Sequence, residues 1–366
     1  METIGKLTLR ERLAVKPLWS EIFFEDSDLF TDYYFKEKMP ENIGYGLKKD
    51  GRLAAMLFLT PYTGRIRLPG REDRFLDVPL HYIVGVGTKR EYRHRGYMGA
   101  LLRHALSKLH AAGAPFTFLM PADPAIYTPY QFRYIYVRPK YRVTEEGRRR
   151  AQPMKSGEEA ALAAFAERFL EERYQFFLKR DASYYRRQKK ESLAQNGDVY
   201  LWKEDGEIAG FYLYARENGK TEIQEAAGER QTAEGMLEIS EKKEPIIMAR
   251  IADAAAMLSL LRLREEAPDT SVSIAVAVKD PLIAQNNATF LWTVGKKEST
   301  IALLEKTEDA QVCVAIEALT EFVFGRKSAA ACFDCISEKN GNICGGIYAK
   351  LSEVAVLSEI CLNEIV

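Results

Sequence analysis

The sequence has few cysteines, few histidines, no excess of either charge and no long hydrophobic run. Its five cysteines all follow residue 312, an odd number in one region, which favours reduced thiols over a disulfide framework. Cys332-x-x-Cys335 with Cys344 lacks a fourth ligand, and all four histidines lie between residues 81 and 110. Structural zinc sites almost always have four protein ligands, so we expect no bound metal.

The balance of charges excludes other functions. Lys and Arg together number 52, as do Asp and Glu, so nothing points to nucleic acid or a membrane surface as a partner. No hydrophobic run reaches the ~20 residues of a membrane span, and the opening residues METIGKLTLRER lack the apolar core of an export signal. We expect a cytoplasmic protein. A chain of 366 residues, 47% of them hydrophobic, is long enough for two or three packed domains.

The most informative stretch covers residues 78–113. Residues 78–88 are mostly apolar and predict a buried strand, in which Gly85 and Gly87 remove side chains where a ligand could approach. Apolar residues then recur at helical spacing, and Gly113 ends the predicted helix. A basic turn therefore joins a buried strand to the amino end of an amphipathic helix.

This turn, RHRGYMG at positions 93–99, suits a phosphate group. A helix amino terminus offers unpaired backbone N–H groups and the positive end of the helix dipole. Gly96 lets the chain come close to a ligand, and Arg93 and Arg95 add guanidinium groups that match phosphate oxygens. The alternative is a basic turn that is only solvated surface.

The R-x-x-G pattern of Arg93 and Gly96 resembles the acyl-CoA pyrophosphate loop of the GNAT acetyltransferases. Met98 stands where many members of that superfamily carry Gly or Ala, and this departure, like the block EYRHRGYMGALLRHAL as a whole, resembles the Eis-like branch, named for enhanced intracellular survival. The resemblance implies that acetyl-CoA is the cosubstrate. The residues expected to bind it are Val84, Val86, Gly87, Thr88, Arg93, His94, Arg95, Gly96, Tyr97, Met98 and Gly99.

The segment after the helix is similar to the one that carries the catalytic tyrosine of this family. Residues 116–120 alternate as a central strand would, and splaying of this strand from residues 83–88 would open a cleft for pantetheine, as the resemblance implies. The aromatic block at 126–134 places the proton-donor role on Tyr127 by resemblance. The alternative is that Tyr127 is a core or pocket aromatic, as most of the neighbouring tyrosines must be.

Acetyl transfer to an amine also needs a base and groups that hold the thioester oxygen. Residues 81–88 contain no carboxylate, so the base must come from elsewhere. By resemblance it is the terminal carboxylate of Val366, on an extended tail docked into the cleft, while backbone N–H groups near Val86 and Thr88 hold the thioester. His81 is the alternative base, although a single histidine in a strand is more often structural.

The residues before position 40 predict the leading helices of a first domain. Asp26, with the aromatic residues Phe24 and Tyr34, could line a pocket for a cationic amine. The alternative is that Asp or Ser residues here cap a helix. Asp50-Gly51 then marks a hairpin between two strands.

The chain also contains an internal repeat. KDGRLAAM at 49–56 and EDGEIAGF at 204–211 match at an offset of 155 residues, which indicates a duplicated domain. The second copy has no R-x-x-G turn at the matching distance, so we expect it not to bind the coenzyme.

From about residue 249 the pattern changes. Strands are expected at 271–278 and 288–293 and helices near 316–324 and 328–337, an order that resembles the sterol-carrier-protein-like domain of the Eis-like branch. We therefore expect an α+β fold with mixed sheets in three domains. These are a catalytic GNAT domain at 1–148, a second GNAT-like domain without the coenzyme loop at 149–248, and a sterol-carrier-protein-like domain that supplies the terminal carboxylate at 249–366.

The predicted function is that of an acetyl-CoA-dependent N-acetyltransferase. The acceptor would be the primary amine of a small molecule such as an aminoglycoside or a polyamine, or a lysine side chain, attacking directly in a ternary complex. The competing class is a non-enzymatic CoA- or lipid-binding carrier or regulatory protein. The resemblance further implies a homo-oligomer, a hexamer.

Overall fold

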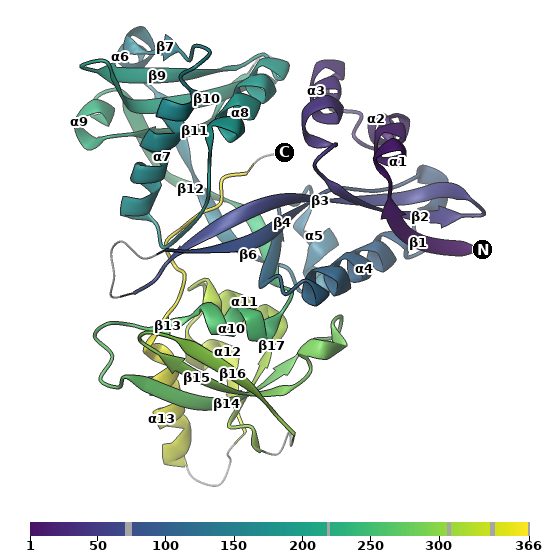
Figure 1. The fold of residues 1–366 in the computed structure, drawn as a ribbon, viewed down its shortest axis with the longest axis vertical. Helices are drawn as coiled ribbons and strands as arrows, with labels where there is room; N and C mark the ends of the chain where they lie inside the picture. Colours follow the sequence, from purple (N-terminus) through teal and green to yellow (C-terminus); the bar gives the residue numbers. More distant parts are fainter. Residues whose placement is uncertain (70–74, 218–219, 306–308, 337–340, 365–366) are drawn as a thin grey trace.

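The computed structural model describes residues 1–69, 75–217, 220–305, 309–336 and 341–364. Its helices and mixed sheets form three lobes joined by long strands (Figure 1). We call these lobes the first unit (the nine-stranded sheet with α1–α4), the second unit (the four-stranded sheet with α7 and α8) and the third unit (the five-stranded sheet with α10–α13). The expected class, a mixed α/β fold with several sheets, is confirmed.

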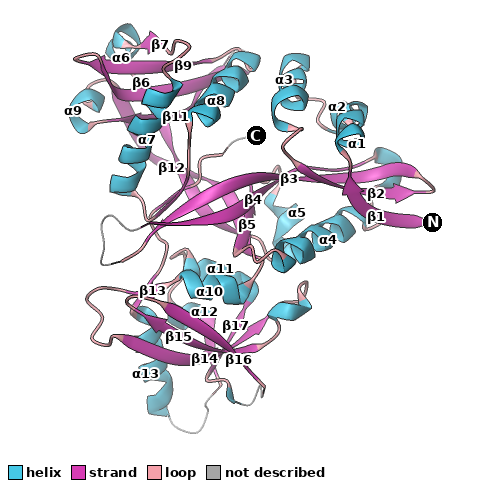
Figure 2. Ribbon diagram, viewed as in Figure 1, coloured by secondary structure: helices cyan, strands magenta, loops and turns pink. Residues whose placement is uncertain are grey.

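The nine-stranded sheet has the order β1-β2-β3-β4-β5-β12-β6, and β8 pairs with both β3 and β20. Its long strands β3 and β4 run side by side through the middle of the molecule (Figure 2). Among the described strands of this sheet, only β4 with β5 and β8 with β20 pair in parallel. The strands are β1 Glu2–Leu7, β2 Ile43–Lys49, β3 Arg52–Arg67, β4 Phe75–Thr88, β5 Phe116–Leu119, β6 Arg133–Val143, β8 Phe176–Leu178, β12 Leu237–Ile251 and β20 Ile360–Cys361.

Helices cover both faces of this sheet. Met56 and Phe58 of β3 pack against the helices near the amino terminus, whereas Leu57 and Leu59 pack against α4, the period-two alternation of a strand buried on both sides. The helices are α1 Leu9–Ala14, α2 Lys16–Ile22, α3 Asp28–Tyr33 with the π-helical turn Tyr34–Lys38, and α4 Tyr97–Ala111. The expected end of α4 is confirmed, because Gly113 has the positive φ of 68° that terminates many helices.

The two repeated sequences form the same local structure. Asp50 and Gly51, between β2 and β3, have φ values of 49° and 79°, and Asp205 and Gly206 have values of 49° and 87°. The second hairpin belongs to a sheet of order β11-β10-β9-β7. Its strands and covering helices are β7 Gln152–Pro153, β9 Asp198–Glu204, β10 Glu207–Glu217, β11 Lys220–Gly228, α7 Glu159–Arg173 and α8 Ala182–Ala194.

Strand β12 connects the units. Its later residues lie between β5 and β6 in the nine-stranded sheet, with Arg250 opposite Thr117 of β5. Most of β12 falls before residue 249, so part of the segment expected in the second domain completes the sheet of the first unit.

The third unit has a sheet of order β16-β15-β14-β17-β18. The strands expected at 271–278 and 288–293 and the helix near 316–324 are confirmed. The helix expected at 328–337 is wrong, because only four residues are helical before the chain becomes β18 and pairs with β17. The elements are β14 Ser271–Lys279, β15 Thr289–Gly295, β16 Ser299–Leu304, β17 Val312–Ala315, β18 Phe333–Cys335, α10 Ala254–Leu260, α11 Ile316–Val323, α12 Ala329–Cys332 and α13 Gly341–Ser352.

Cys335 and Cys344 form a disulfide, so the expectation of reduced thiols throughout is wrong for this pair. The end of β18 and the start of α13 bring their Cα atoms to 5.9 Å, a separation that suits a disulfide and that sequence spacing alone does not reveal. Cys313, Cys332 and Cys361 are buried and free.

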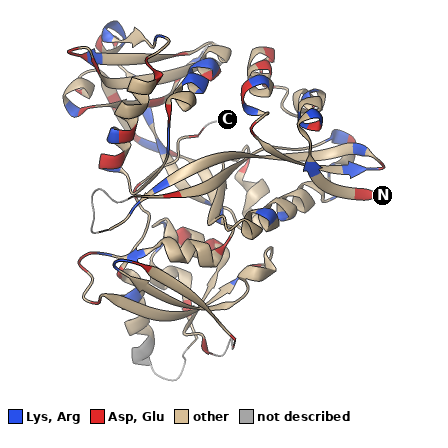
Figure 3. Cartoon of the chain, viewed as in Figure 1, with Lys and Arg blue, Asp and Glu red and all other residues tan. Residues whose placement is uncertain are grey.

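Two further observations concern partners. Within the described ranges, no group of His, Cys, Asp or Glu is placed to hold a metal ion, and no helix is long and apolar enough to cross a membrane. Figure 3 shows both basic and acidic positions on the helices near the amino terminus, whereas α4 carries basic positions and no acidic one.

Candidate active site

The central feature of the site is the point where β4 and β5 separate. The two strands pair only at His81–Thr117 and Tyr82–Phe118. Beyond Tyr82, β4 continues to Thr88 with no described strand on that side, so its backbone groups there are open to a ligand. The backbone N–H of Met120 donates to the Tyr82 hydroxyl at 3.1 Å, which fixes the apex of the opening.

A β-bulge lies on the open part of β4. Phe58 pairs with Val84 and Met56 with Gly87, so Gly85 and Val86 together stand opposite a single residue of β3. Gly85 adopts a φ of 58° there. Such bulges redirect backbone groups and are common beside active sites.

The glycines of this strand line the cavity described below and also allow close packing behind the strand. A Cβ atom on Gly85 would lie 2.5 Å from the Trp19 ring, and one on Gly87 would lie 2.6 Å from Ile22. Both positions are therefore required to be small by the packing of α2 against β4, a long-range contact that the sequence does not show.

The amino end of α4 forms the polar end of the site. Gly96, with a φ of 78°, is the N-cap, and no side chain caps the helix. The N–H groups of the first turn therefore have no partner within the helix. Arg93 lies beside them and donates through Nε to the Thr88 carbonyl at 3.3 Å, whereas the Arg95 guanidinium lies 5.7 Å from the centre of the Tyr92 ring.

One cavity of about 830 Å³ joins this helix end to the open strand. Its wall includes most of the residues singled out in the sequence: Asp26, Val84, Val86, Gly87, Thr88, Arg93, His94, Gly96, Tyr97, Met98, Gly99 and Tyr127. It also includes residues that sequence reasoning missed, among them Trp19, Ile22, Glu25 and Tyr130. The recurrence of apolar residues in the amino-terminal helices was the available signal for Trp19 and Ile22, and the aromatic block at 126–134 was the signal for Tyr130.

Tyr127 ends the short helix α5, Pro124–Tyr127, on the opposite wall of the cavity. Its side chain is 9% exposed, and its ring packs edge-on against Phe132 with centroids 5.9 Å apart. Burial is the sole cause that raises the pKa of Tyr127 to about 12. The phenol therefore stays protonated at neutral pH.

Only one of the three residues proposed for the amine pocket, Asp26, lines this cavity. The Asp26 carboxylate is on the cavity wall and accepts a hydrogen bond from Trp19 Nε1 at 2.9 Å, and Ser27 supplies the N-cap of α3. Phe24 is 78% exposed, and Tyr34 is fully buried with its hydroxyl hydrogen-bonded to Asn42. Neither of these two aromatic side chains is on the cavity wall.

A second cavity, of about 970 Å³, lies between β3 and β4 on one side and α7 and α8 on the other. His81, the alternative base, is on this wall. Burial lowers the pKa of His81, and its Nδ1 is buried without a hydrogen-bond partner. The ring is therefore neutral and has unused hydrogen-bonding capacity.

The described end of the chain enters the junction beside this second cavity. Residues 360–364 are all buried. The Glu364 carboxylate accepts hydrogen bonds from Tyr62 of β3 at 3.0 Å and Tyr184 of α8 at 2.9 Å, and lies 3.8 Å from Arg180. Val366, the expected base, lies outside the described residues.

Comparisons with known proteins agree with this geometry. Residues 3–135 match the family model described as an acetyltransferase (GNAT) domain. No curated protein matches the sequence.

Solved structures resemble the whole chain. A conserved protein of unknown function from Enterococcus faecalis, a probable N-acyltransferase, is similar over 98% of this chain and 99% of its own, with 15% identity and a TM-score of 0.75. A GCN5-related N-acetyltransferase from Kribbella flavida has the same coverage and identity and a TM-score of 0.71. Eis1 from Mycobacterium abscessus is similar over 100% of both chains, with 15% identity and a TM-score of 0.68. At such identities these likenesses show a shared fold.

Proposed function

We propose that this chain, an acyltransferase with a GNAT acetyltransferase domain at residues 3–135, transfers acetyl from acetyl-CoA to the primary amine of a small molecule or of a lysine side chain. The observation that carries this proposal is the single cavity of about 830 Å³, which joins the uncapped end of α4, the open edge of β4 and Tyr127. The places proposed for phosphate binding, thioester binding and proton donation thus lie in one continuous cavity.

The wall of the cavity fits acetyl-CoA at each of these places. The free N–H groups of Tyr97, Met98 and Gly99 and the guanidinium of Arg93 suit the pyrophosphate, since a helix amino end stabilises anions. The open edge of β4 can hydrogen-bond to the amides of pantetheine as a further strand would. Val84 to Thr88, with the bulge, then face the thioester.

The groups assigned to the site account for each step of acetyl transfer. The neutral amine nitrogen attacks the thioester carbonyl carbon, and backbone N–H groups of the bulged strand stabilise the oxyanion that forms. The C–S bond then breaks, and the Tyr127 hydroxyl gives its proton to the departing thiolate. The proton lost by the amine goes to a base, and the Tyr127 phenolate takes up a proton again from the protonated base through solvent, so the net products are the N-acetylated amine and CoA.

We take the terminal carboxylate of Val366 as that base. The support comes from the described tail before it, because Glu364 is hydrogen-bonded to Tyr62, whose ring lies 6.5 Å from that of Tyr82 at the apex of the β4–β5 opening. His81 is the alternative, since it is neutral and has an unpaired Nδ1, although it lines the second cavity and not the one that holds Tyr127.

The acceptor class follows from the charge of the cavity wall. Glu25 and Asp26 are the carboxylates on its wall, and they favour an acceptor that carries several amines, such as an aminoglycoside or a polyamine. Opposite charges nearby stabilise the additional ammonium groups of such a molecule.

The division of the chain remains part of the proposal. We assign 1–148 to the catalytic domain, 149–248 to a second GNAT-like domain without the coenzyme turn, and 249–366 to a sterol-carrier-protein-like domain. Support comes from the shared turn geometry of the two hairpins. The full-length likeness to Eis1 supports the same arrangement. The hexamer is proposed on the sequence resemblance alone, and sedimentation analysis would test it.

The decisive experiment measures CoA thiol release with acetyl-CoA and a panel of aminoglycosides, polyamines and lysine peptides. We expect release to depend on an amine and Tyr127→Phe to lower kcat at least ~100-fold with little change in acetyl-CoA affinity. Tyr134→Phe, on the same segment but away from this cavity, is the control. Acetyl-CoA binding without release on any amine would instead favour a carrier, and a normal rate for Tyr127→Phe would make that tyrosine a packing residue.

A further inference from the structure

The segment that carries Tyr127 is held by groups outside the acetyltransferase domain. The chain turns sharply after Tyr127, and Gln131 adopts a φ of 62° at the end of the turn. Between them, the Tyr130 carbonyl accepts a hydrogen bond from Arg250 Nε at 3.0 Å. Arg250 is on β12, next to β5, and its side chain is 0% exposed.

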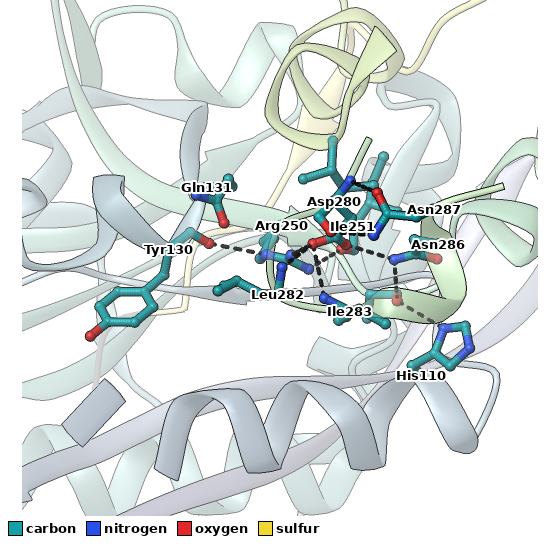
Figure 4. Close-up of polar contacts among 12 residues, drawn as sticks. His110, Tyr130, Gln131, Arg250, Ile251, Asp280, Leu282, Ile283, Asn286 and Asn287 are labelled. Atoms are coloured by element: carbon teal, nitrogen blue, oxygen red, sulfur yellow. Dashed lines mark hydrogen bonds and ion pairs between the residues drawn. The ribbon is translucent and has the colours of Figure 1, made fainter. Parts of the chain in front are cut away.

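The other side of the Arg250 guanidinium reaches the third unit. One terminal nitrogen donates to Asp280 at 2.5 Å, and the Asp280 side chain is also 0% exposed. Figure 4 shows Arg250 lying between Tyr130 and the loop that carries Asp280. The Asp280 carboxylate is itself fixed by three further donors, the backbone N–H groups of Leu282 and Ile283 and the amide of Asn286.

A second arginine repeats this arrangement. Arg133 donates to the carbonyls of Thr128 at 3.3 Å and Phe132 at 2.9 Å, on the same segment. Its guanidinium lies 3.7 Å from the carboxylate of Glu317 in α11. Two arginines thus hold backbone carbonyls around Tyr127, and a carboxylate of the third unit orients each of them.

The opposite side of the segment contacts the coenzyme turn. A Cβ atom on Gly99 would lie 2.3 Å from the Tyr130 hydroxyl, so the Tyr130 ring is pressed against the first turn of α4. A shift of the Tyr130 backbone would therefore move both the Tyr127 hydroxyl and this contact. Catalytic groups must be held to within a fraction of an ångström.

The cost of burying these charges also requires an explanation. A fully buried ion pair is rarely better for stability than well-packed apolar residues, so burial of Arg250 and Asp280 calls for a role beyond holding the fold together. Arginine suits such a role because its planar fork can bond to a carboxylate and a carbonyl at once.

We propose that Arg250 is a positioning residue for Tyr127, and that the third unit serves the reaction by orienting Arg250 through Asp280, with Arg133 and Glu317 as a second support. This inference rests on the proposed function, in which Tyr127 protonates the departing thiolate. Asp280 and Glu317 of the third unit thereby influence the rate of acetyl transfer without touching either substrate.

Arg250→Lys separates this role from simple folding. Lysine keeps a positive charge for Asp280, but its single ammonium group cannot also replace the bond from Nε to the Tyr130 carbonyl. We expect kcat to fall at least ~10-fold, while the Kd for acetyl-CoA changes less than twofold. The matched control is Arg262→Lys, which removes an arginine that donates to carbonyls elsewhere in the third unit, those of Ser259, Leu261 and Lys297, and it should keep its kcat.

A double-mutant cycle with Tyr127→Phe distinguishes a positioning role of Arg250 from a merely structural one. If Arg250 acts through Tyr127, Arg250→Lys should lower kcat less than twofold in the Tyr127→Phe background. An equal loss in both backgrounds, or a normal kcat for a folded Arg250→Lys enzyme, overturns the inference while leaving the proposed function intact. A normal rate for Tyr127→Phe itself refutes the catalytic assignment instead.

If Arg250→Lys does not fold, the inference can be tested at Arg133 instead. Arg133→Gln removes the second support at a site where both partners are partly exposed. It should lower kcat at least ~3-fold, and again less than twofold in the Tyr127→Phe background. Equal losses in the two backgrounds would count against the inference.

Discussion

Replacement of Gly85 by alanine tests the packing that shapes the open strand. Gly85 has a φ of 58°, and an L-residue with that backbone costs about 1–2 kcal/mol. The new Cβ would also lie 2.5 Å from Trp19 and 2.9 Å from Phe58. Trp19 cannot move freely, because its ring stacks on Tyr34 with centroids 4.7 Å apart and its Nε1 is hydrogen-bonded to Asp26.

Overpacking of this kind costs a further ~1–3 kcal/mol, so we expect Gly85→Ala to lower the free energy of unfolding by about 3 kcal/mol. Gly51→Ala is the matched control, since Gly51 has a φ of 79° but no atom within 4 Å of the added Cβ. Its cost should be only about 1 kcal/mol.

Urea denaturation of both variants measures the difference between them. The bulge also carries the backbone groups that face the thioester, so kcat of Gly85→Ala should fall as well, by up to ~100-fold for a displacement near 1 Å. Equal destabilisation by the two substitutions would refute the reasoning, because it would mean that the contact with Trp19 adds nothing to the backbone strain.

Two other changes test the coenzyme turn and the proposed base. Arg93→Glu should weaken acetyl-CoA binding by about 2 kcal/mol in calorimetry, as expected for loss of a charge-assisted contact. Arg95→Glu should weaken binding less, because the Arg95 guanidinium lies over Tyr92. Equal losses of affinity in the two variants would contradict the placement of the pyrophosphate. Extension of the chain past Val366 by a few Gly and Ser residues converts that carboxylate to an amide, so thiol release should collapse while acetyl-CoA still binds, and an amino-terminal tag should be tolerated. Full turnover by the extended enzyme, with its mass verified, would make His81 the next candidate base.

Local patterns in the sequence predicted the elements that contact the coenzyme. The strand before the basic turn, the helix after it and the Asp50-Gly51 hairpin are determined by apolar periodicity, by glycine at helix ends and by a two-residue turn, which act over a few neighbouring residues. The first strand, β1, was missed because it is mostly exposed on an edge and lacks a hydrophobic pattern; its pairing with β2 is a long-range contact.

Long-range contacts are the part that the sequence did not reveal. The insertion of β12 between β5 and β6, the parallel pairing of β20 with β8 and the Cys335–Cys344 disulfide all join segments whose proximity no local signal encodes. The same limit applies to the site. Tyr127 was found by resemblance to a motif, whereas Arg250 is a single arginine in a strand, and its importance is visible only once its bonds to the Tyr130 carbonyl and to the buried Asp280 are known.

The pH dependence of stability provides a final test, centred on Glu364. Burial raises the pKa of Glu364 above 4.5, against the opposing effects of Arg180, Lys38 and the two tyrosine hydroxyls. A carboxyl group with a raised folded-state pKa stabilises the fold most at pH values below its unfolded pKa. This contribution is lost as the pH rises through the folded value, because the native state then gives up a proton that the unfolded state has already released.

The wild type should therefore lose stability relative to Glu364→Gln as the pH increases from about 4.5, with a slope of at most ~1.4 kcal/mol per pH unit for one proton. Tyr184→Phe is the control, since it removes one hydrogen bond to the carboxylate but leaves the titrating group buried, so the decline with pH should persist. Urea titrations between pH 4 and 8 give the difference in unfolding free energy directly. A difference between wild type and Glu364→Gln that is constant, or that grows in favour of the wild type as the pH rises, would show that Arg180 holds Glu364 ionised throughout and that the tail is anchored by an ion pair.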